Sequence, residues 1–576
     1  MKKLIALLLA LVLVVGMFAG CGKTEVEVNP EQAQPEATEG AEAAPTEEQA
    51  PPAEEAGESE TPLVIQWDQN NGTDVIEPPY VASSLSYHTR MIWSQIYEEN
   101  DAYQRTDPEF YAWDLGTSIV ANEDNTEYVV TIREDAVWSD GEPVTADDVA
   151  FSVMVNILDP VSTAAKPFNK VVGFEALTNG EAETLEGMSV EDNTITFKLV
   201  EPNANFAPNL FVLPAHCFEG LAWAEISTAD YWKNPVTSGP YVVAETSFPD
   251  YMKLTRNDNY YGLAAGIKNI TCVSYETAGS DAAVAAMITG EADITTRTVT
   301  SSGVIANEIA DANPDCVIKT MHSDLVRGFV FNMGNRSDGN NKDVLVNDAN
   351  ARLAISLLID EDTIADYLAS VACKTYGNPN NPYTPHDYDN DNKSLDLEKA
   401  KSLLDAAGWN YDDEIEILCY YTDQPSLDVL EIIKADAAKI GVKMKVNVIT
   451  ENAGVAIYTD KNFDIMFFQG NGKALDPGEG LSNLTKESWT FTYPTSWIPE
   501  KYGPLQDAKN AAVPGTEEFT TALHAMIAAN QEDMLFIPVY VNATVITYNT
   551  AHVYIPETAF DYYDDVLDLH EWKMLH

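Results

Sequence analysis

Hydrophobic and polar residues follow two periods along this chain, and together they predict short strands mixed with amphipathic helices. Alternation or a short apolar run predicts strands at residues 63–67, 128–133 and 194–199, with another strand at 329–333. Helical spacing predicts helices at residues 84–98, 282–290, 350–360, 396–409 and within 434–448, where a glycine stop and a strand follow. The inner side of the first helix is formed by Leu85, Met91, Ile92 and Ile96. Helices and strands mixed in this order indicate α/β domains.

The segment 137–152, VWSDGEPVTADDVAFS, predicts a strand end, a tight turn and a capped helix. Asp140-Gly141 is a turn dipeptide, and Pro143 fixes an extended exit. Thr145 is a natural N-cap, and Asp148 three residues later comes close to a capping box. The buried side of the helix is expected to contain Val149, Phe151, Val153 and Met154. Taken alone, this pattern stabilises a helix and indicates no chemistry.

The first 20 residues read as a targeting segment, with two lysines followed by an apolar stretch from Leu4 to Phe18. This stretch is shorter than the roughly 20 residues that span a bilayer. The tetrapeptide ending at Cys21, Phe-Ala-Gly-Cys, resembles a bacterial lipobox in which Phe replaces the usual Leu. The resemblance implies cleavage before Cys21 and acylation of that residue, which would anchor the chain to the membrane. The alternative is an ordinary secretory signal with a chance cysteine.

Residues 24–61 form a low-complexity segment that contains 12 Glu and no Lys or Arg. Such a composition cannot bury a core, so we expect a disordered tether extended by self-repulsion. We place this tether at residues 21–61, after the signal peptide at 1–20.

Composition narrows the choice of partners. The chain has 576 residues, which suggests two or three domains, and its formal net charge is -58. An acidic surface of this kind makes nucleic acid and anionic lipid poor partners. The six cysteines show no CxxC spacing and stand at positions 21, 217, 272, 316, 373 and 419. We expect mostly buried thiols, with one distant disulfide left open.

Catalytic motifs do not appear in the sequence. There is no HExxH, GxSxG or hydrolase-like SxxK pattern, and the GNGKAL segment at 470–475 lacks the third glycine of a dinucleotide loop. The eight histidines are scattered, so a His-rich metal site is not expected, and no cofactor is indicated. A binding protein is therefore a simpler interpretation than an enzyme.

Several blocks, in order from residue 63 to the C-terminus, resemble the family 5 extracellular solute-binding proteins, which are the oligopeptide- and dipeptide-binding proteins of ABC importers. The segment 137–152 closely resembles the signature segment of that family. Further blocks with family-like sequence are SGPYVV…RNDNYYG within 238–262, GEADI at 290–294, RLAISLLID at 352–360, DLEKAKSLLDAAGW at 396–409, FDIM at 463–466 and IPVY at 537–540.

The resemblance implies a two-lobed, type II periplasmic-binding-protein-like α/β clamshell with an extra domain, three domains in all. Hinge strands join the lobes, which close on a buried ligand. Lobe I is discontinuous and is expected at 62–98, 224–325 and 535–576. The extra domain II is expected at 99–223, and lobe III at 326–534.

The resemblance also suggests ligand-binding residues. In peptide-binding members, an Asp after the strand equivalent to 463–466 holds the α-ammonium of the peptide. The nearest acid here is Asp476, within an Asp-Pro pair that could instead be a turn former. Gln469 or Gly470 stands where Trp is common, and Gly472 or Lys473 falls near the expected Asp, where a Lys would repel an ammonium. Aromatic residues that could line the cleft or simply pack in a core are Trp489, Tyr493 and Trp497, and from the other lobe we select Trp67 and Gln69.

We therefore expect a monomeric, extracytoplasmic receptor, anchored through Cys21, that captures a short peptide and delivers it to the permease and ATPase subunits of an importer. A sugar, an opine or a nickel complex remains an alternative ligand. A sensory lipoprotein that uses the same fold is an alternative function, and a secreted hydrolase is a distant third.

Overall fold

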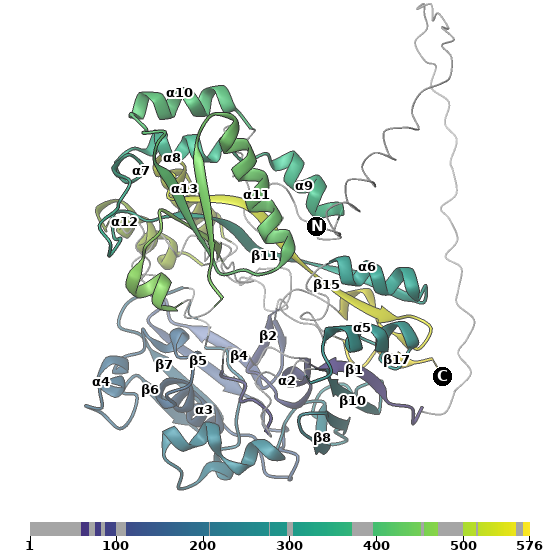
Figure 1. Ribbon diagram of the computed structural model, residues 1–576. Helices are drawn as coiled ribbons and strands as arrows, with labels where there is room; N and C mark the ends of the chain where they lie inside the picture. The colour runs from purple at the N-terminus through teal and green to yellow at the C-terminus, as the bar shows by residue number, and fades with distance from the viewer. Residues whose placement is uncertain are drawn as a thin grey trace, which may run out of the picture. The chain divides into compact units, whose positions relative to one another are not determined.

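The computed structural model of the protein describes the residues 59–67, 75–81, 87–99, 111–204, 206, 208–275, 277–295, 303–370, 395–450, 454–470, 499–513, 516–559 and 568–575 (Figure 1). The chain divides into two units, Met1–Ala56 and Gly57–His576, and every described residue belongs to the second. This second unit contains three sheets of four or five strands.

The first sheet has the strand order β1-β10-β9-β8, with β1 parallel to β10 and the other pairs antiparallel. Its strands are β1 (Leu63–Trp67), β10 (Asn269–Ser274), β9 (Tyr251–Arg256) and β8 (Tyr241–Ser247). Alternate residues of β1, Leu63, Ile65 and Trp67, enter one large buried cluster with Ile270 and Cys272 of β10. This pattern follows from the two-residue period of a strand. Nearby helices in sequence are α2 (Tyr87–Ile92), α5 (Ser280–Thr289) and α6 (Gly303–Ala312).

The second sheet is antiparallel throughout, in the order β4-β5-β7-β6. Its strands are β4 (Gly116–Ala121), β5 (Glu127–Ile132), β7 (Thr194–Lys198) and β6 (Met188–Glu191). Helix α3 (Ala146–Leu158) packs Val149 and Val153 into the same core as Val130 and Phe197. The short elements α4 (Phe174–Thr178) and the 3-10 helix η3 (Lys166–Phe168) contribute Leu177 and Phe168 to this core. The 3-10 helices η4 (Ala215–Phe218), η5 (Trp223–Thr228) and η6 (Asp230–Lys233) instead contribute Phe218, Ile226 and Trp232 to the buried cluster of the first sheet.

The third sheet is mixed, in the order β13-β12-β14-β11-β15. Its strands are β13 (Lys443–Val448), β12 (Glu414–Cys419), β14 (Ile465–Gly470), β11 (Cys316–Phe331) and β15 (Phe536–Asn549). Ile465 and Phe467 of β14 enter one buried cluster, and Met466 and Phe468 enter another. The sheet is therefore buried on both faces, as is typical where helices cover parallel strands.

Helices and small pairs complete the described fold. The helices are α7 (Asp343–Asn347), α8 (Ala349–Ser356), α9 (Glu361–Ser370), α10 (Leu397–Ala407), α11 (Gln424–Lys439), α12 (Pro499–Ala511) and α13 (Glu517–Asp533). A π-helical turn, η7, spans Val455–Asp460, and a 3-10 turn, η10, spans Glu557–Ala559. The remaining pairs are β2 (Tyr97–Glu99) with β3 (Tyr111–Trp113), and β16 (Val553–Tyr554) with β17 (Lys573–Met574).

Strands β11 and β15 form a long antiparallel pair that connects two of these sheets (Figure 1). One end of β11, from Val326 to Phe331, pairs with β14 of the third sheet. At the other end, Tyr548 of β15 bridges to Ile294, which in turn bridges to Ile65 of the first sheet. The register of the pair shifts between His322 and Val326, where a β-bulge interrupts the ladder. This pair has the connectivity expected of hinge strands.

Most predicted elements are present with small shifts at their ends. The capping box of Thr145 and Asp148 is formed, and Gly141 adopts φ +96 in the predicted turn. Gly290 and Gly408 are left-handed C-caps of the helices predicted at 282–290 and 396–409. Phe151 is only partly buried, whereas Val149, Val153 and Met154 are buried. The helix predicted at 350–360 ends at Ser356, and the strand predicted at 463–466 begins at Ile465.

The predicted helix at 84–98 is wrong over its second half. Helix α2 ends at Ile92, and β2 begins at Tyr97. The carbonyl oxygen of Ser94 accepts a hydrogen bond from the N–H of Val212, and the N–H of Ile96 donates to the carbonyl oxygen of Leu210. These long-range pairings satisfy the backbone in an extended form, which overrides the local helical spacing. Ile96 is buried as predicted, but from an extended segment.

The described cysteines, Cys217, Cys272, Cys316 and Cys419, are all free thiols, and the last three are buried. Within the described ranges, none of the helices has both the length and the apolar composition that a membrane span requires.

Candidate functional site

The carboxyl ends of β12 and β14 define the candidate ligand site. These two strands are parallel, with Ile417 opposite Ile465 and Cys419 opposite Phe467. In open α/β sheets, ligands bind outside the carboxyl ends of the strands, where the connecting loops diverge. Beyond β14 the chain continues into residues 471–498, which lie outside the described residues. We call this place the sheet edge.

A buried arginine organises the described part of the sheet edge. Arg327 lies on β11 directly opposite Gln469 of β14, and it is 7% exposed. Its Nη1 atom donates to Oδ2 of Asp423 at 3.1 Å and also to the hydroxyl of Ser426. Its guanidinium carbon lies 3.6 Å from the centre of the Tyr421 ring. Charge pairing and stacking on an aromatic face are both ordinary roles for a guanidinium.

The N-terminus of α11 is fixed at this arginine. Asp423 is the N-cap and accepts a hydrogen bond from the N–H of Ser426 at 3.0 Å. Pro425 lies in the first turn, where its missing N–H costs no hydrogen bond. The Ser426 hydroxyl also lies 3.1 Å from the hydroxyl of Tyr540 on β15. One cluster of side chains therefore joins β11, β15 and α11.

The charges in this cluster balance one another. Burial alone would raise the pKa of Asp423, but the charge of Arg327 and the hydrogen bonds from Ser426 outweigh it, so the pKa lies below its ordinary value. Burial lowers the pKa of Arg327, and the neighbouring Tyr540 and Asp423 more than compensate, so its pKa is raised. Both groups are therefore ionised near neutral pH. Because Asp423 is already paired, it is poorly suited to anchor a ligand ammonium.

The loop that leaves β12 adds two tyrosines, with their rings tilted against each other, to the sheet edge. The rings of Tyr420 and Tyr421 have centroids 4.4 Å apart, and their hydroxyls lie 2.9 Å apart. Both residues are partly exposed. The described edge thus combines aromatic rings with a paired charge, and it is suited to aromatic contacts and neutral hydrogen bonding rather than to acid–base chemistry.

Most of the predicted site residues lie outside the described residues. These are Cys21, Gln69, Asp476, Trp489, Tyr493 and Trp497. The backbone of Gln469 lies in β14, which pairs directly with β12, the strand before the loop that carries Tyr421. Trp67 is 5% exposed and its ring packs against Phe248 at a centroid distance of 5.6 Å. The ligand-binding roles of all these residues stay predictions.

The sequence analysis missed Arg327 and its partners. A signal was available, because an arginine interrupts an otherwise apolar strand in LVRGFVF. A charge in a strand that is buried on both faces demands a partner. The partner could not be identified from the sequence, because Asp423 and Ser426 stand 96 and 99 residues from Arg327 along the chain.

The α/β fold and the sheet edge are consistent with a solute-binding protein. Comparison with known proteins identifies the family. Residues 112–491 match the family model described as bacterial extracellular solute-binding proteins, family 5 Middle. This match covers more than half of the chain. The chain therefore belongs to the family 5 solute-binding proteins, whose members are receptors of ABC importers and not enzymes.

Relatives and solved structures agree with this assignment. The nickel-binding periplasmic protein of Escherichia coli is 24% identical over 481 residues, which cover 79% of this chain and 85% of the relative. The oligopeptide-binding protein AppA of Bacillus subtilis is 25% identical over 371 residues, which cover 61% of this chain and 63% of AppA. The ABC transporter substrate-binding protein CtaP of Listeria monocytogenes is 19% identical and superposes with a TM-score of 0.70 over 90% of this chain and 99% of CtaP. The predictions of the family, the two-lobed α/β fold and a non-enzymatic receptor are confirmed.

Proposed function

We propose that this protein is a lipid-anchored, extracytoplasmic receptor that captures a short peptide and delivers it to the permease of an ABC importer. The observation that carries the peptide assignment is the arrangement of the sheet edge. Its partly exposed tyrosines can contact a ligand, and because Arg327 is paired with Asp423 the sheet edge does not demand one net charge. Peptides of varied sequence require such tolerance. The relative named as an oligopeptide-binding protein supports the same ligand class.

In this proposal Asp476 supplies the carboxylate that holds the peptide α-ammonium. Asp423 cannot readily do so, because its charge is neutralised by Arg327. Gln469 and the aromatic residues after it complete the wall of the cleft in lobe III, at 326–534. Trp67 and Gln69 contribute from lobe I, at 62–98, 224–325 and 535–576, while domain II, at 99–223, is the accessory part. The aromatic residues concerned are Trp489, Tyr493 and Trp497.

Acylation of Cys21 forms the membrane anchor in this proposal, and the acidic segment 21–61 acts as a tether. Metabolic labelling with a radioactive fatty acid tests the anchor. Label should enter the wild-type chain and be absent from Cys21→Ser, which should then be found in the culture medium. Equal labelling of both chains would contradict acylation at Cys21.

A nickel complex is the second candidate ligand. The nickel-binding periplasmic protein of Escherichia coli matches 79% of this chain, more than AppA does. Lys473 would also repel a peptide ammonium but would attract an anionic chelate. The two candidates differ in the role of Asp476, since an anionic complex gains nothing from that carboxylate.

Thermal unfolding in the presence of di- to hexapeptides, oligosaccharides and nickel with or without histidine separates these candidates. A ligand at about 100 times its Kd should add about 2.7 kcal/mol to the free energy of unfolding. We expect a shift of the unfolding midpoint with several peptides. Asp476→Ala should reduce that shift, whereas Asp311→Ala, an exposed acid on α6, should leave it unchanged. A shift with the nickel complex alone, equal in wild type and Asp476→Ala, would replace the peptide assignment by the second candidate.

A further inference from the structure

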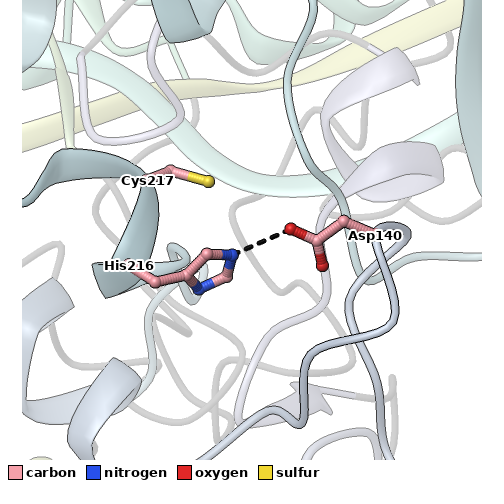
Figure 2. A group of neighbouring side chains, drawn as sticks. All are labelled: Asp140, His216 and Cys217. Carbon is pink, nitrogen blue, oxygen red and sulfur yellow. Dashed lines mark hydrogen bonds and ion pairs between the residues drawn. The ribbon is translucent and has the colours of Figure 1, made fainter.

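Asp140, His216 and Cys217 bring three metal-binding atoms together at a place remote in sequence from the sheet edge. The carboxylate, imidazole and thiol each offer one ligand atom, and these atoms all lie within 4.8 Å of one another. Figure 2 shows His216 and Cys217 extending from η4 toward Asp140, with the imidazole bonded to the carboxylate. Nδ1 or Nε2 of histidine, thiolate sulfur and carboxylate oxygen are together the ligand set that zinc prefers.

The backbone holds Asp140 in place. The N–H of Gly141 donates to Trp138, and the N–H of Trp138 donates to Glu142, which closes the turn on both sides. Gly141 has φ +96, a conformation that suits glycine in a turn. Oδ1 of Asp140 accepts a hydrogen bond from the N–H of Glu142 at 3.2 Å, so Oδ2 faces His216. The turn therefore presents one defined carboxylate oxygen.

The other two ligands are equally well supported. The N–H of Ala215, the first residue of η4, donates to Oδ1 of the buried Asp148 at 2.8 Å. Phe218, the last residue of η4, is 2% exposed and stacks on Phe151 of α3 at a centroid distance of 5.6 Å. His216 and Cys217 lie between these two anchors. The segment that carries His216 and Cys217 is thus fixed to helix α3 and its cap.

The spacing fits a small divalent cation. Oδ2 of Asp140 and Nε2 of His216 are 2.9 Å apart. Ligand atoms on a tetrahedral zinc with bonds of about 2.0 to 2.3 Å lie about 3.3 to 3.8 Å from one another. Because no two of the three ligand atoms are more than 4.8 Å apart, small side-chain rotations would reach that geometry. The Asp140 and His216 side chains are about one-third exposed, at 35% and 34%, so a water molecule can take the fourth position.

The electrostatics also favour a cation. Burial raises the pKa of the Cys217 thiol to about 11, and the negative charges of Asp140 and Asp148 contribute to the shift. A divalent cation held by these ligands would offset the negative charge of the two aspartates and stabilise the thiolate.

We propose that Asp140, His216 and Cys217 form a surface zinc site with three protein ligands and one open position. The site joins the turn before α3 to η4, two segments 76 residues apart along the chain. Zinc bound there cross-links the two segments and stabilises this part of the fold. This inference is independent of the solute ligand, because none of the three residues belongs to the sheet edge.

The test is a zinc titration of the full chain after treatment with a chelator, in competition with a chromophoric zinc indicator. We expect the wild-type chain to bind one zinc ion. The affinity for zinc should fall at least tenfold in Cys217→Ser and in His216→Gln. His570→Gln is the matched control, because His570 is likewise an exposed histidine beside an acid, Glu571 at 3.7 Å, and should bind zinc within twofold of wild type. Circular dichroism of each variant shows that the fold is retained.

X-ray absorption at the zinc edge identifies the atoms bound to zinc. It therefore separates metal binding from a purely structural role of these residues. It should show one sulfur at about 2.3 Å and nitrogen or oxygen at about 2.0 to 2.2 Å, with the sulfur absent in Cys217→Ser. Zinc binding that is equal in wild type, Cys217→Ser and His216→Gln would overturn the proposal. Failure of the folded wild-type chain to bind zinc at 100 µM would overturn it as well.

Discussion

Two buried polar residues, Asp148 and Arg327, hold together two different parts of this protein by opposite means. Asp148 is 4% exposed and is surrounded by neutral donors, namely Thr145, the N–H of Ala215 and the indole of Trp138. Arg327 is 7% exposed and depends on an opposite charge, Asp423. Each hydrogen-bond donor around a buried anion contributes separately to its stabilisation. In a buried ion pair, the loss of either partner leaves the other charge uncompensated.

Removing Arg327 should give the largest effect. Arg327→Met leaves Asp423 without its cation and should lower the free energy of unfolding by about 3 kcal/mol. Chemical denaturation measures this loss. Arg133→Met is the matched control, because Arg133 also pairs with an aspartate, Asp135, and lies 4.2 Å from a tyrosine ring, but near the surface. It should cost about 1 kcal/mol or less. Equal losses of unfolding free energy for the two variants would show that burial does not make the ion pair of Arg327 more important for stability.

Truncating Asp148 should have the next largest effect. Asp148→Ala leaves the N–H groups of Thr145 and Ala215 without their acceptor and should cost about 2 kcal/mol. The neighbouring Asp147 is exposed in the same first turn, so Asp147→Ala should change the free energy of unfolding by no more than about 0.5 kcal/mol. Urea denaturation of both variants makes the comparison. A loss in Asp147→Ala as large as in Asp148→Ala would mean that the helix dipole, and not the hydrogen bonds, explains the effect.

The cap alone should contribute less than the whole cluster. In Thr145→Ala, the N–H of Asp148 loses its side-chain acceptor and keeps only the carbonyl of residue 145, while Ala215 keeps its bond to Asp148. The expected cost is about 1 kcal/mol, measured in the same denaturation series. If Thr145→Ala were as damaging as Asp148→Ala, the long-range bond to Ala215 would contribute nothing.

Lowering the pH should give the smallest of the expected effects, through protonation of Asp423. The pKa of Asp423 is lowered in the folded protein, so its contribution is fully present above its ordinary pKa of about 4 and is lost as the pH falls through the lower folded value. The stability difference between wild type and Asp423→Asn should therefore be constant from pH 7 to pH 5 and should narrow below about pH 4. Denaturation at several pH values measures it. A difference that stays constant down to pH 2 would contradict the lowered pKa.

The contrast between the two clusters also explains what the sequence could reveal. The cap at Thr145 and Asp148 was predictable because its partners are three residues apart and obey a local rule. The bond from Asp148 to Ala215, 67 residues away, was not. The Arg327 cluster was missed for the same reason, since its contacts are set by strand pairing. Likewise the helical spacing at 84–98 gave way to pairing of Ser94 and Ile96 with a distant segment.

Local periodicity indicated α/β domains, and resemblance to a family supplied what local rules could not, namely the two-lobed architecture and the receptor function. It did not supply the ligand. The segment that carries Asp476 departs from the family pattern, and Lys473 stands near the expected acid. Ligand choice depends on the few side chains that face the cleft, and these are the positions at which members of one fold differ.

The most direct test of the account is hydrogen exchange of the full chain with and without a saturating mixture of short peptides. If the sheet edge is the ligand site, amides after β12, at residues 419–424, and at the end of β14 should exchange up to about 100-fold more slowly at about 100 times Kd. Amides of α3, at residues 146–158, should be unchanged. Protection of α3 with none at the sheet edge would contradict the assignment of the ligand site.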